Sequence, residues 1–235
     1  MSDYKLTITP IKPDEIPPEE TILALGQEVL ESTSTWKQGK SYHNHTVKTL
    51  SRPKGPGDGA SWHCRLSEHK PEDATFDEFW SKVGVNKAEN EMKFIGDIKK
   101  VTLIKQISPT MSIWSMYYHL PPPISARTFT VLQVTHLYEA SPRSGIIVSI
   151  PVDVTHDPEL AKLEEKAVKG RYVAAERFRE LENGNVEWIV ATSSTPGGMI
   201  PQFITDKSMP SKISDDVPHF LHWFHTVRDS PTNTN

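Results

Sequence analysis

Three stretches of the sequence decide the expected fold: PPPISARTF at residues 121–129, PGGMIPQF at 196–203 and DVPHFLHWF at 216–224. The first leads from a run of prolines into a strand, the second is a turn built from proline and glycine, and the third belongs to an amphipathic helix. The chain between the first two stretches is rich in strands. We therefore expect a sheet that is followed by a carboxy-terminal helix.

Strand patterns dominate the middle of the chain after Asp97, where β-branched and aromatic residues alternate with Pro, Gly, Ser or Asn breaks. The predicted strands are 98–107, 111–120, 127–138, 145–152, 171–180 and 186–194. Such a succession favours an antiparallel meander. Upstream, SYHNHTVKTLSR and ASWHCRLSEH flank the Gly/Pro-rich segment PKGPGDG, a pattern that predicts a hairpin or a longer two-strand connection.

Helices are expected before and after that connection. Apolar residues recur at helical intervals between residues 19 and 36, which predicts a first helix. Thr75 and Glu78 have the spacing of a capping box, in which each side chain satisfies a backbone N–H of the first turn. Asn86 and Glu89 repeat this spacing, so we expect two short helices in succession.

A charged insert and an amphipathic end complete the predicted helices. LAKLEEKAVK is bracketed by the cap Asp157 and by Gly170, which predicts a surface helix between them. Near the end of the chain Pro218 interrupts a helix, so we expect a kink there or a restart capped by Asp215 or Asp216. The apolar stripe of this last helix is formed by Ile213, Val217, Phe220, Phe224 and Val227.

Composition narrows the class of protein. The chain has 235 residues, a single cysteine and a formal net charge of −4. One domain of this length can bury a core without disulfides or metals, and we expect it to span residues 1–228, with a disordered polar tail at 229–235. The chain opens without a signal sequence, and no apolar run reaches the ~20 residues of a membrane-spanning helix. We expect a monomeric, cytoplasmic protein that does not bind nucleic acid, because no basic tract is present.

The three motifs, taken in order, resemble those of START-type lipid-transfer domains. Residues 121–127 match the P-x-P-x-S-x-R pattern that opens a central strand in the phosphatidylcholine-transfer type. Residues 196–201 match its PGG-x-IP turn, and residues 217–221 match V-P-x-F-L. The resemblance covers roughly residues 75–225, and more narrowly the chain looks like a fungal START-like family of undefined function. It implies an α+β helix-grip fold, in which a curved antiparallel sheet wraps around a long C-terminal helix.

Three features depart from the family pattern. Thr128 stands where the phosphatidylcholine type has an acidic residue after the arginine, so the resemblance does not extend to a phospholipid headgroup. Only two clear strands precede the short helices unless YKLTIT, residues 4–9, supplies a third. The insert at 157–169 is the third departure, and it predicts a different cavity mouth.

The resemblance implies a cavity between the sheet and the last helix for one lipid or other hydrophobic molecule. It requires no cofactor and no metal, and it implies intracellular transfer with transient membrane contact. If Arg127 points inward, the period of two places alternate residues of its strand on the same face. The residues expected to contact the ligand are Arg127, Phe129, Val131, Gln133, Tyr172, Glu176, Phe178, Trp188, Met199, Phe203, Val217, Phe220 and Phe224.

Two charged residues of this set have alternative interpretations. An inward Glu176 requires a partner, and the candidates are Arg127, His119 or a ligand amine, with a structural ion pair as the simplest account. Arg127 itself either anchors the start of its strand or contacts a headgroup.

Two other classes of function stay open. Related helix-grip folds include cyclases and dehydratases, for which Tyr117, His119 and Glu176 would be the acid–base groups. A protein-interaction adaptor with a collapsed pocket is the third possibility. A metal site is not expected, because His219, His222 and His225 point to different sides of a helix.

Overall fold

A long antiparallel sheet forms the body of the computed structural model, which describes residues 4–228. The strands are β1 (Lys37–Tyr42), β2 (Val47–Arg52), β3 (Trp62–His69), β4 (Ile98–Ser108), β5 (Met111–Tyr118), β6 (Arg127–Tyr138), β7 (Ser144–Pro151), β8 (Val168–Lys169), β9 (Arg171–Glu180) and β10 (Val186–Thr195). The helices are α1 (Glu19–Ser32), α2 (Phe76–Phe79), α3 (Lys87–Phe94), α4 (Pro158–Ala161) and α5 (Gln202–Arg228), with the short turns η1 (Thr33–Thr35) and η2 (Trp80–Gly84).

The strand order confirms the predicted meander. It runs β1-β2-β3-β10-β9-β7-β6-β5-β4, and the two-residue β8 pairs in parallel with β6. All six strands that the sequence predicts are present, and their observed ends differ from the predicted ones by at most two residues. The meander continues into β3, which pairs with β10. The antiparallel sheet and the long final helix are those of an α+β helix-grip fold.

β1 is a strand that the sequence did not reveal. Its residues, KQGKSY, are mostly exposed and carry no alternating apolar pattern, because β1 lies at one end of the sheet. The segment YKLTIT, considered for an extra strand, is not one; nearby, Ile11 forms only an isolated bridge to Val152. Three strands therefore precede the short helices.

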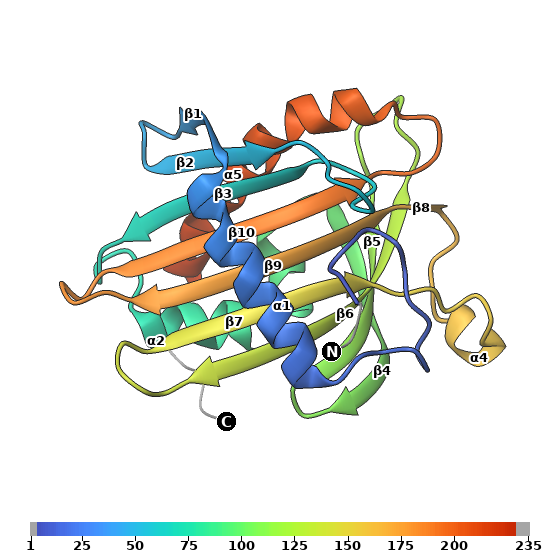
Figure 1. Ribbon diagram of the computed structural model, residues 1–235, viewed down its shortest axis with the longest axis horizontal. Coiled ribbons are helices and arrows are strands. Elements are labelled where there is room, and N and C mark those ends of the chain that lie inside the picture. The colour runs from blue at the N-terminus through green and yellow to red at the C-terminus, as the bar shows by residue number, and fades with distance from the viewer. Residues whose placement is uncertain (1–3, 229–235) are drawn as a thin grey trace.

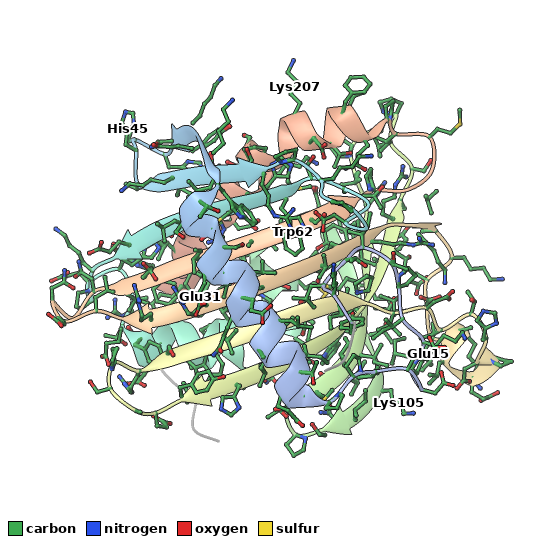
Figure 2. All side chains as sticks on the ribbon, viewed as in Figure 1. Glu15, Glu31, His45, Trp62, Lys105 and Lys207 are labelled. Atoms are coloured by element: carbon green, nitrogen blue, oxygen red, sulfur yellow. The ribbon has the colours of Figure 1, made fainter. Side chains whose placement is uncertain are left out.

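Two layers of helix cover the two faces of the sheet. Figure 1 shows α1 crossing the front of the sheet, with α2 and the last turns of α5 behind it. We call the side under α1 the outer face and the side under α5 the inner face. Trp62, labelled in Figure 2, belongs to the apolar layer between α1 and the outer face. Gly26 allows α1 to approach closely, since a Cβ there would lie 2.4 Å from Val148 Cγ2.

The short helices follow the predicted caps in part. Thr75 and Glu78 form the capping box: Glu78 N donates to Thr75 Oγ1 at 3.3 Å, and Thr75 N donates to Glu78 Oε2 at 2.8 Å. The second predicted box is wrong, because Asn86 has φ 50° and its side chain makes no capping bond, although α3 starts directly after it. The predicted insert helix is only one turn, α4, whose N–H groups are capped by Asp157.

The final helix is longer than its apolar stripe. It continues through Pro210 and Pro218, so the restart expected at Asp215 or Asp216 does not occur. Its buried apolar residues include four of the predicted stripe, whereas Val227 is 37% exposed. Figure 1 shows the first turns of α5 along one edge of the sheet and its last turns behind the sheet. No helix within residues 4–228 is long and apolar enough to span a membrane.

Candidate functional site

Charged side chains gather on the inner face of the sheet. They are Arg65, Lys87, Glu91, Glu176 and Asp216, which we call the interior charge cluster. Arg65 of β3 and Glu176 of β9 lie in one row across the sheet, because both pair with Val190 of β10. Antiparallel pairing keeps the residues of one row on the same face, so both side chains point toward α5. α3 contributes two members of the cluster, and α5 contributes Asp216.

Lys87 is held between two carboxylates. Its Nζ lies 2.6 Å from Glu176 Oε2 and 2.7 Å from Glu91 Oε1. Burial alone would lower the pKa of Lys87, but the two carboxylates outweigh it and the pKa is raised. Glu176 also accepts a hydrogen bond of 2.6 Å from Trp188 Nε1. Glu176 is therefore in an ion pair as expected, but the partner is Lys87 rather than Arg127 or His119.

Arg65 is a buried cation that lacks hydrogen-bond acceptors. It is 2% exposed, and its Cζ lies 3.8 Å from the centroid of the Trp188 ring, so the guanidinium makes a cation–π contact. Within the described part of the chain, its Nε and Nη1 groups are buried without a hydrogen-bond partner. Burial lowers the pKa of Arg65, whereas the charges of Asp216, Glu176 and Glu91 act to raise it.

Asp216 is the acid of the cluster that faces Arg65 from α5. Burial raises the pKa of its carboxyl group to about 7, and the charge of Arg65 partly offsets this rise. Among residues 4–228, the Asp216 side chain makes no hydrogen bond and no ion pair. Arg65 and Asp216 thus attract each other without direct contact.

Two tyrosines lie beside the charges. Burial raises the pKa of Tyr118, and Tyr172, Glu91 and Asp216 add to the effect. Burial also raises the pKa of Tyr172. Phe129 lies between the two tyrosine rings, with centroid distances of 5.2 Å to Tyr118 and 5.8 Å to Tyr172. These groups extend the inner face toward β5 and β6.

Packed aromatic rings close the other side of the cluster. Phe220 of α5 has its ring centroid 5.1 Å from Phe79, 5.5 Å from Trp188 and 5.7 Å from Phe224. Phe178 lies 5.2 Å from Trp188. Five residues of the predicted ligand set, Phe178, Trp188, Val217, Phe220 and Phe224, meet in this apolar cluster. The four aromatic rings among them contact one another in succession, so this region forms a packed floor under α5.

The remaining predicted contacts divide into inward and outward groups. Val131 and Gln133 are buried on β6, and Gln133 Nε2 has no partner in the described structure. Arg127 is buried but donates to the carbonyl oxygens of Pro196 (2.9 Å) and Ser125 (2.5 Å), which makes it an anchor for the turn before α5. The structure corrects the prediction for Met199 and Phe203. Met199 is 98% exposed and Phe203 is 70% exposed, so neither side chain points inward.

The proposed acid–base groups do not converge. Tyr117 pairs with Thr128 and shares the face opposite to that of Tyr118, because neighbouring strand residues alternate. His119 lies just beyond β5 and is exposed, whereas Glu176 is buried on the inner face. The three side chains therefore do not form one site in this structure.

Comparison with known proteins places the chain in a family. Residues 62–224 match the family model described as "Protein of unknown function (DUF3074)". The chain belongs to the DUF3074 family. Curated proteins give no match to it.

Solved structures identify the fold of this DUF3074 chain. Human STARD10 has a TM-score of 0.74 and 12% identity, over 92% of this chain and 82% of that one. Human StAR-related lipid transfer protein 5 has a TM-score of 0.69 and 15% identity, over 90% and 100%. A STAR-related lipid transfer protein fragment from Xanthomonas axonopodis has a TM-score of 0.63 and 15% identity, over 81% and 98%. The fold is START-like, as the motifs indicated.

Sequence reasoning missed most of the interior charge cluster of the DUF3074 chain. A signal for Arg65 was present, because Trp62, Cys64 and Leu66 alternate with polar residues in β3. Lys87 and Glu91 are spaced by four, which places both on one side of α3. Asp216 was considered only as a helix cap.

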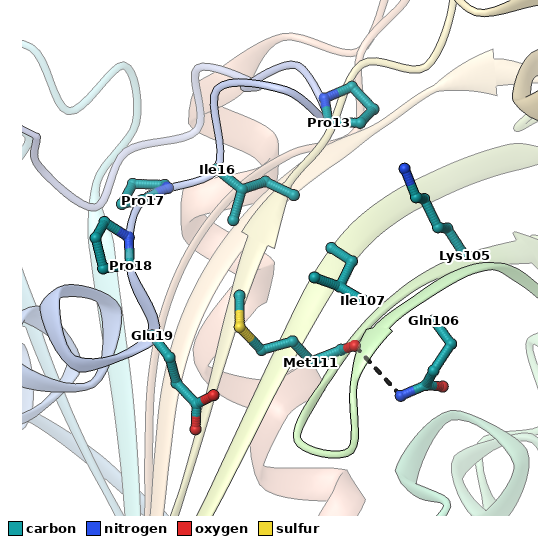
Figure 3. Close-up of a pocket in the computed structure, with 9 residues that line it drawn as sticks. All are labelled: Pro13, Ile16, Pro17, Pro18, Glu19, Lys105, Gln106, Ile107 and Met111. Atoms are coloured by element: carbon teal, nitrogen blue, oxygen red, sulfur yellow. Dashed lines mark hydrogen bonds between the residues drawn. The ribbon is translucent and has the colours of Figure 1, made fainter.

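A separate groove lies outside the sheet. It has a volume of about 410 Å³ and runs between the Pro13–Glu19 segment and the hairpin of β4 and β5 (Figure 3). Ile16, Ile107 and Met111 contribute its apolar walls. None of the predicted ligand contacts of the DUF3074 chain lines it.

Proposed function

We propose that this protein binds one lipid or similar hydrophobic molecule between the inner face of the sheet and α5, and carries it within the cell. The interior charge cluster supports this proposal most directly. Buried charges cost free energy, and a core that served stability alone would be filled by apolar side chains. Two proteins of the same fold carry lipid transfer in their names. The floor of packed rings supplies an apolar surface beside the charges.

The combination of desolvation and accessible surface at four side chains supports a ligand space at the cluster. Four residues keep part of their surface accessible although burial raises the pKa of each: Glu91, Tyr118, Tyr172 and Asp216. Desolvation accounts for the raised pKa values, and the remaining accessible surface leaves room for a ligand beside these groups. Each methylene of an acyl chain buried there would contribute about 0.8 kcal/mol.

Native mass spectrometry of the purified protein, followed by solvent extraction, tests the proposal. We expect a mass increment that corresponds to one bound lipid, or uptake of one equivalent of a fluorescent fatty-acyl probe. The adaptor alternative predicts neither. A protein that is empty and also refuses the probe would overturn the proposal. The expectations of a monomer in the cytoplasm stay predictions, which the same mass spectrum and a localisation experiment address.

Lipid exchange with a membrane is expected to use the exposed start of α5. Met199, Phe203 and Ile204 are large apolar residues that are exposed at this point. Burying a Met or Phe side chain yields about 1.5–3 kcal/mol, and about 1.4 kcal/mol is tenfold in affinity. The double variant Met199→Ser, Phe203→Ser should therefore bind phosphatidylcholine vesicles at least about tenfold more weakly in a sedimentation assay.

A matched control uses exposed apolar residues elsewhere. Leu103→Ser with Ile107→Ser removes two such side chains from β4, and vesicle binding should then stay within about twofold of the wild type. Equal losses in the two double variants would show that the start of α5 is not the membrane contact.

An enzymatic role is not proposed. The residues suggested for acid–base chemistry lie on different faces, as described above, and Glu176 is held by Lys87 and Trp188. A general base needs to be within hydrogen-bond reach of the proton that it abstracts. The geometry therefore favours binding over catalysis.

A further inference from the structure

Arg65 offers hydrogen bonds that the protein does not accept. Its Nε and Nη1 groups are buried and, in the described residues, have no partner. A buried donor without an acceptor costs free energy comparable to a lost hydrogen bond. The aromatic face of Trp188 holds the guanidinium in place but offers no acceptor oxygen. A ligand that satisfies the guanidinium donors of Arg65 must therefore carry a hydrogen-bond acceptor.

Asp216 is a hydrogen-bond acceptor that lacks a donor among the described residues. Its carboxylate accepts no hydrogen bond within residues 4–228, and its charge acts on Arg65 across the space between them. The residue keeps accessible surface, so it is not sealed on every side by its neighbours. A ligand that satisfies the Asp216 carboxylate must carry a hydrogen-bond donor.

The charges of the cluster restrict the ligand group further. Three carboxylates, Glu91, Glu176 and Asp216, face only two cations, and Lys87 is already taken by the first two. A ligand carboxylate or phosphate would complete Arg65 but add another negative charge beside Asp216. A ligand ammonium has donors and no acceptor, so it would leave Arg65 unpaired.

We propose that Arg65 and Asp216 together bind a neutral group that both accepts and donates a hydrogen bond, such as the hydroxyl of a long-chain alcohol or a hydroxylated lipid. The oxygen accepts from the Arg65 guanidinium, and the hydroxyl proton is donated to the Asp216 carboxylate. The apolar part of the ligand then lies along the inner face. This inference rests on the proposed function and specifies its ligand class.

Three probes with the same alkyl chain separate the possibilities: hexadecanol, hexadecanoate and hexadecylamine. Their affinities are measured by displacement of a fluorescent lipid from the full chain at about pH 8.5, where the Asp216 carboxyl group, whose pKa is raised to about 7, is ionised. We expect hexadecanol to bind at least about tenfold more tightly than the other two, since each charged probe leaves one of the two protein groups unpaired or repelled. Tightest binding of hexadecanoate or hexadecylamine, or equal binding of all three, would overturn the inference while leaving lipid binding intact. Failure of every lipid to bind would instead contradict the proposed function.

Two variants test the roles of the two residues. Asp216→Asn removes the negative charge but keeps an acceptor, so hexadecanoate should gain at least about fivefold relative to hexadecanol. Arg65→Met keeps an apolar contact with Trp188 and removes the donors, so the preference for hexadecanol should fall to about twofold or less. Arg171→Met, at an exposed arginine of β9, is the matched control and should keep the full preference.

Folding of each variant is checked by circular dichroism. If Arg65→Met does not fold, two measurements still test the inference. They are the order of the probe affinities in the wild type and the change in that order in Asp216→Asn. An unchanged ratio of hexadecanoate to hexadecanol affinity in a folded Asp216→Asn variant would show that Asp216 does not contact the ligand group.

Discussion

Lys87→Met is expected to lower the free energy of unfolding by about 3–5 kcal/mol, because removing one partner of a buried ion pair leaves uncompensated charge. Glu176 and Glu91 would both lose the ammonium that lies within 2.7 Å of them. Urea denaturation followed by fluorescence measures the change.

The companion variants separate charge from packing. Adding Glu176→Gln and Glu91→Gln to Lys87→Met removes the stranded carboxylates, and we expect the triple variant to recover at least about 1 kcal/mol of the loss. Lys99→Met, at an exposed lysine of β4, should change the stability by less than about 0.5 kcal/mol. A triple variant that is no more stable than Lys87→Met would show that packing, rather than charge, accounts for the effect.

Phe220→Ala is expected to cost about 3–5 kcal/mol of stability, the range for removing a buried phenylalanine ring from a core. The ring is 0% exposed and contacts Phe79, Trp188 and Phe224. Its loss would leave a cavity where α5 meets the sheet. The expected result is a lower urea midpoint with an unchanged slope.

Phe203→Ala is the control on the same helix. That ring is 70% exposed, and its removal should change the stability by no more than about 0.5 kcal/mol. A loss equal to that of Phe220→Ala would mean that the start of α5 is packed in solution. In that case the start of α5 would not be free to contact a membrane, and the vesicle-binding prediction would also fail.

The strands were predictable because their signal is local. Each strand of the meander has enough β-branched and aromatic residues to stand out between Pro, Gly and Asn breaks. β1 was not predictable, since an exposed end strand has no apolar face to leave a pattern. The cap at Asn86 was misjudged because a left-handed backbone there points the side chain away from the first turn.

The site was predictable only where strand alternation decides it. Alternation correctly placed Glu176, Phe178 and Val131 on the inner side of the sheet. The partner of Glu176 was missed because Lys87 comes from a helix, and the approach of a helix to a strand depends on tertiary packing. Met199 and Phe203 were assigned inward because their apolar character suggests burial, yet apolar atoms also make up much of a protein surface.

The open strand order has a consequence for how copies of this protein behave at high concentration. β4 lies at one end of the sheet and has a free row of backbone groups, which in a flat strand would template another chain. Its pairing with β5 shifts register at three places, and Lys99, Lys100 and Lys105 are exposed along it. Irregular spacing and like charges oppose the edge-to-edge addition of a second β4. The strand that leaves the sheet open is therefore a poor template for another copy of itself.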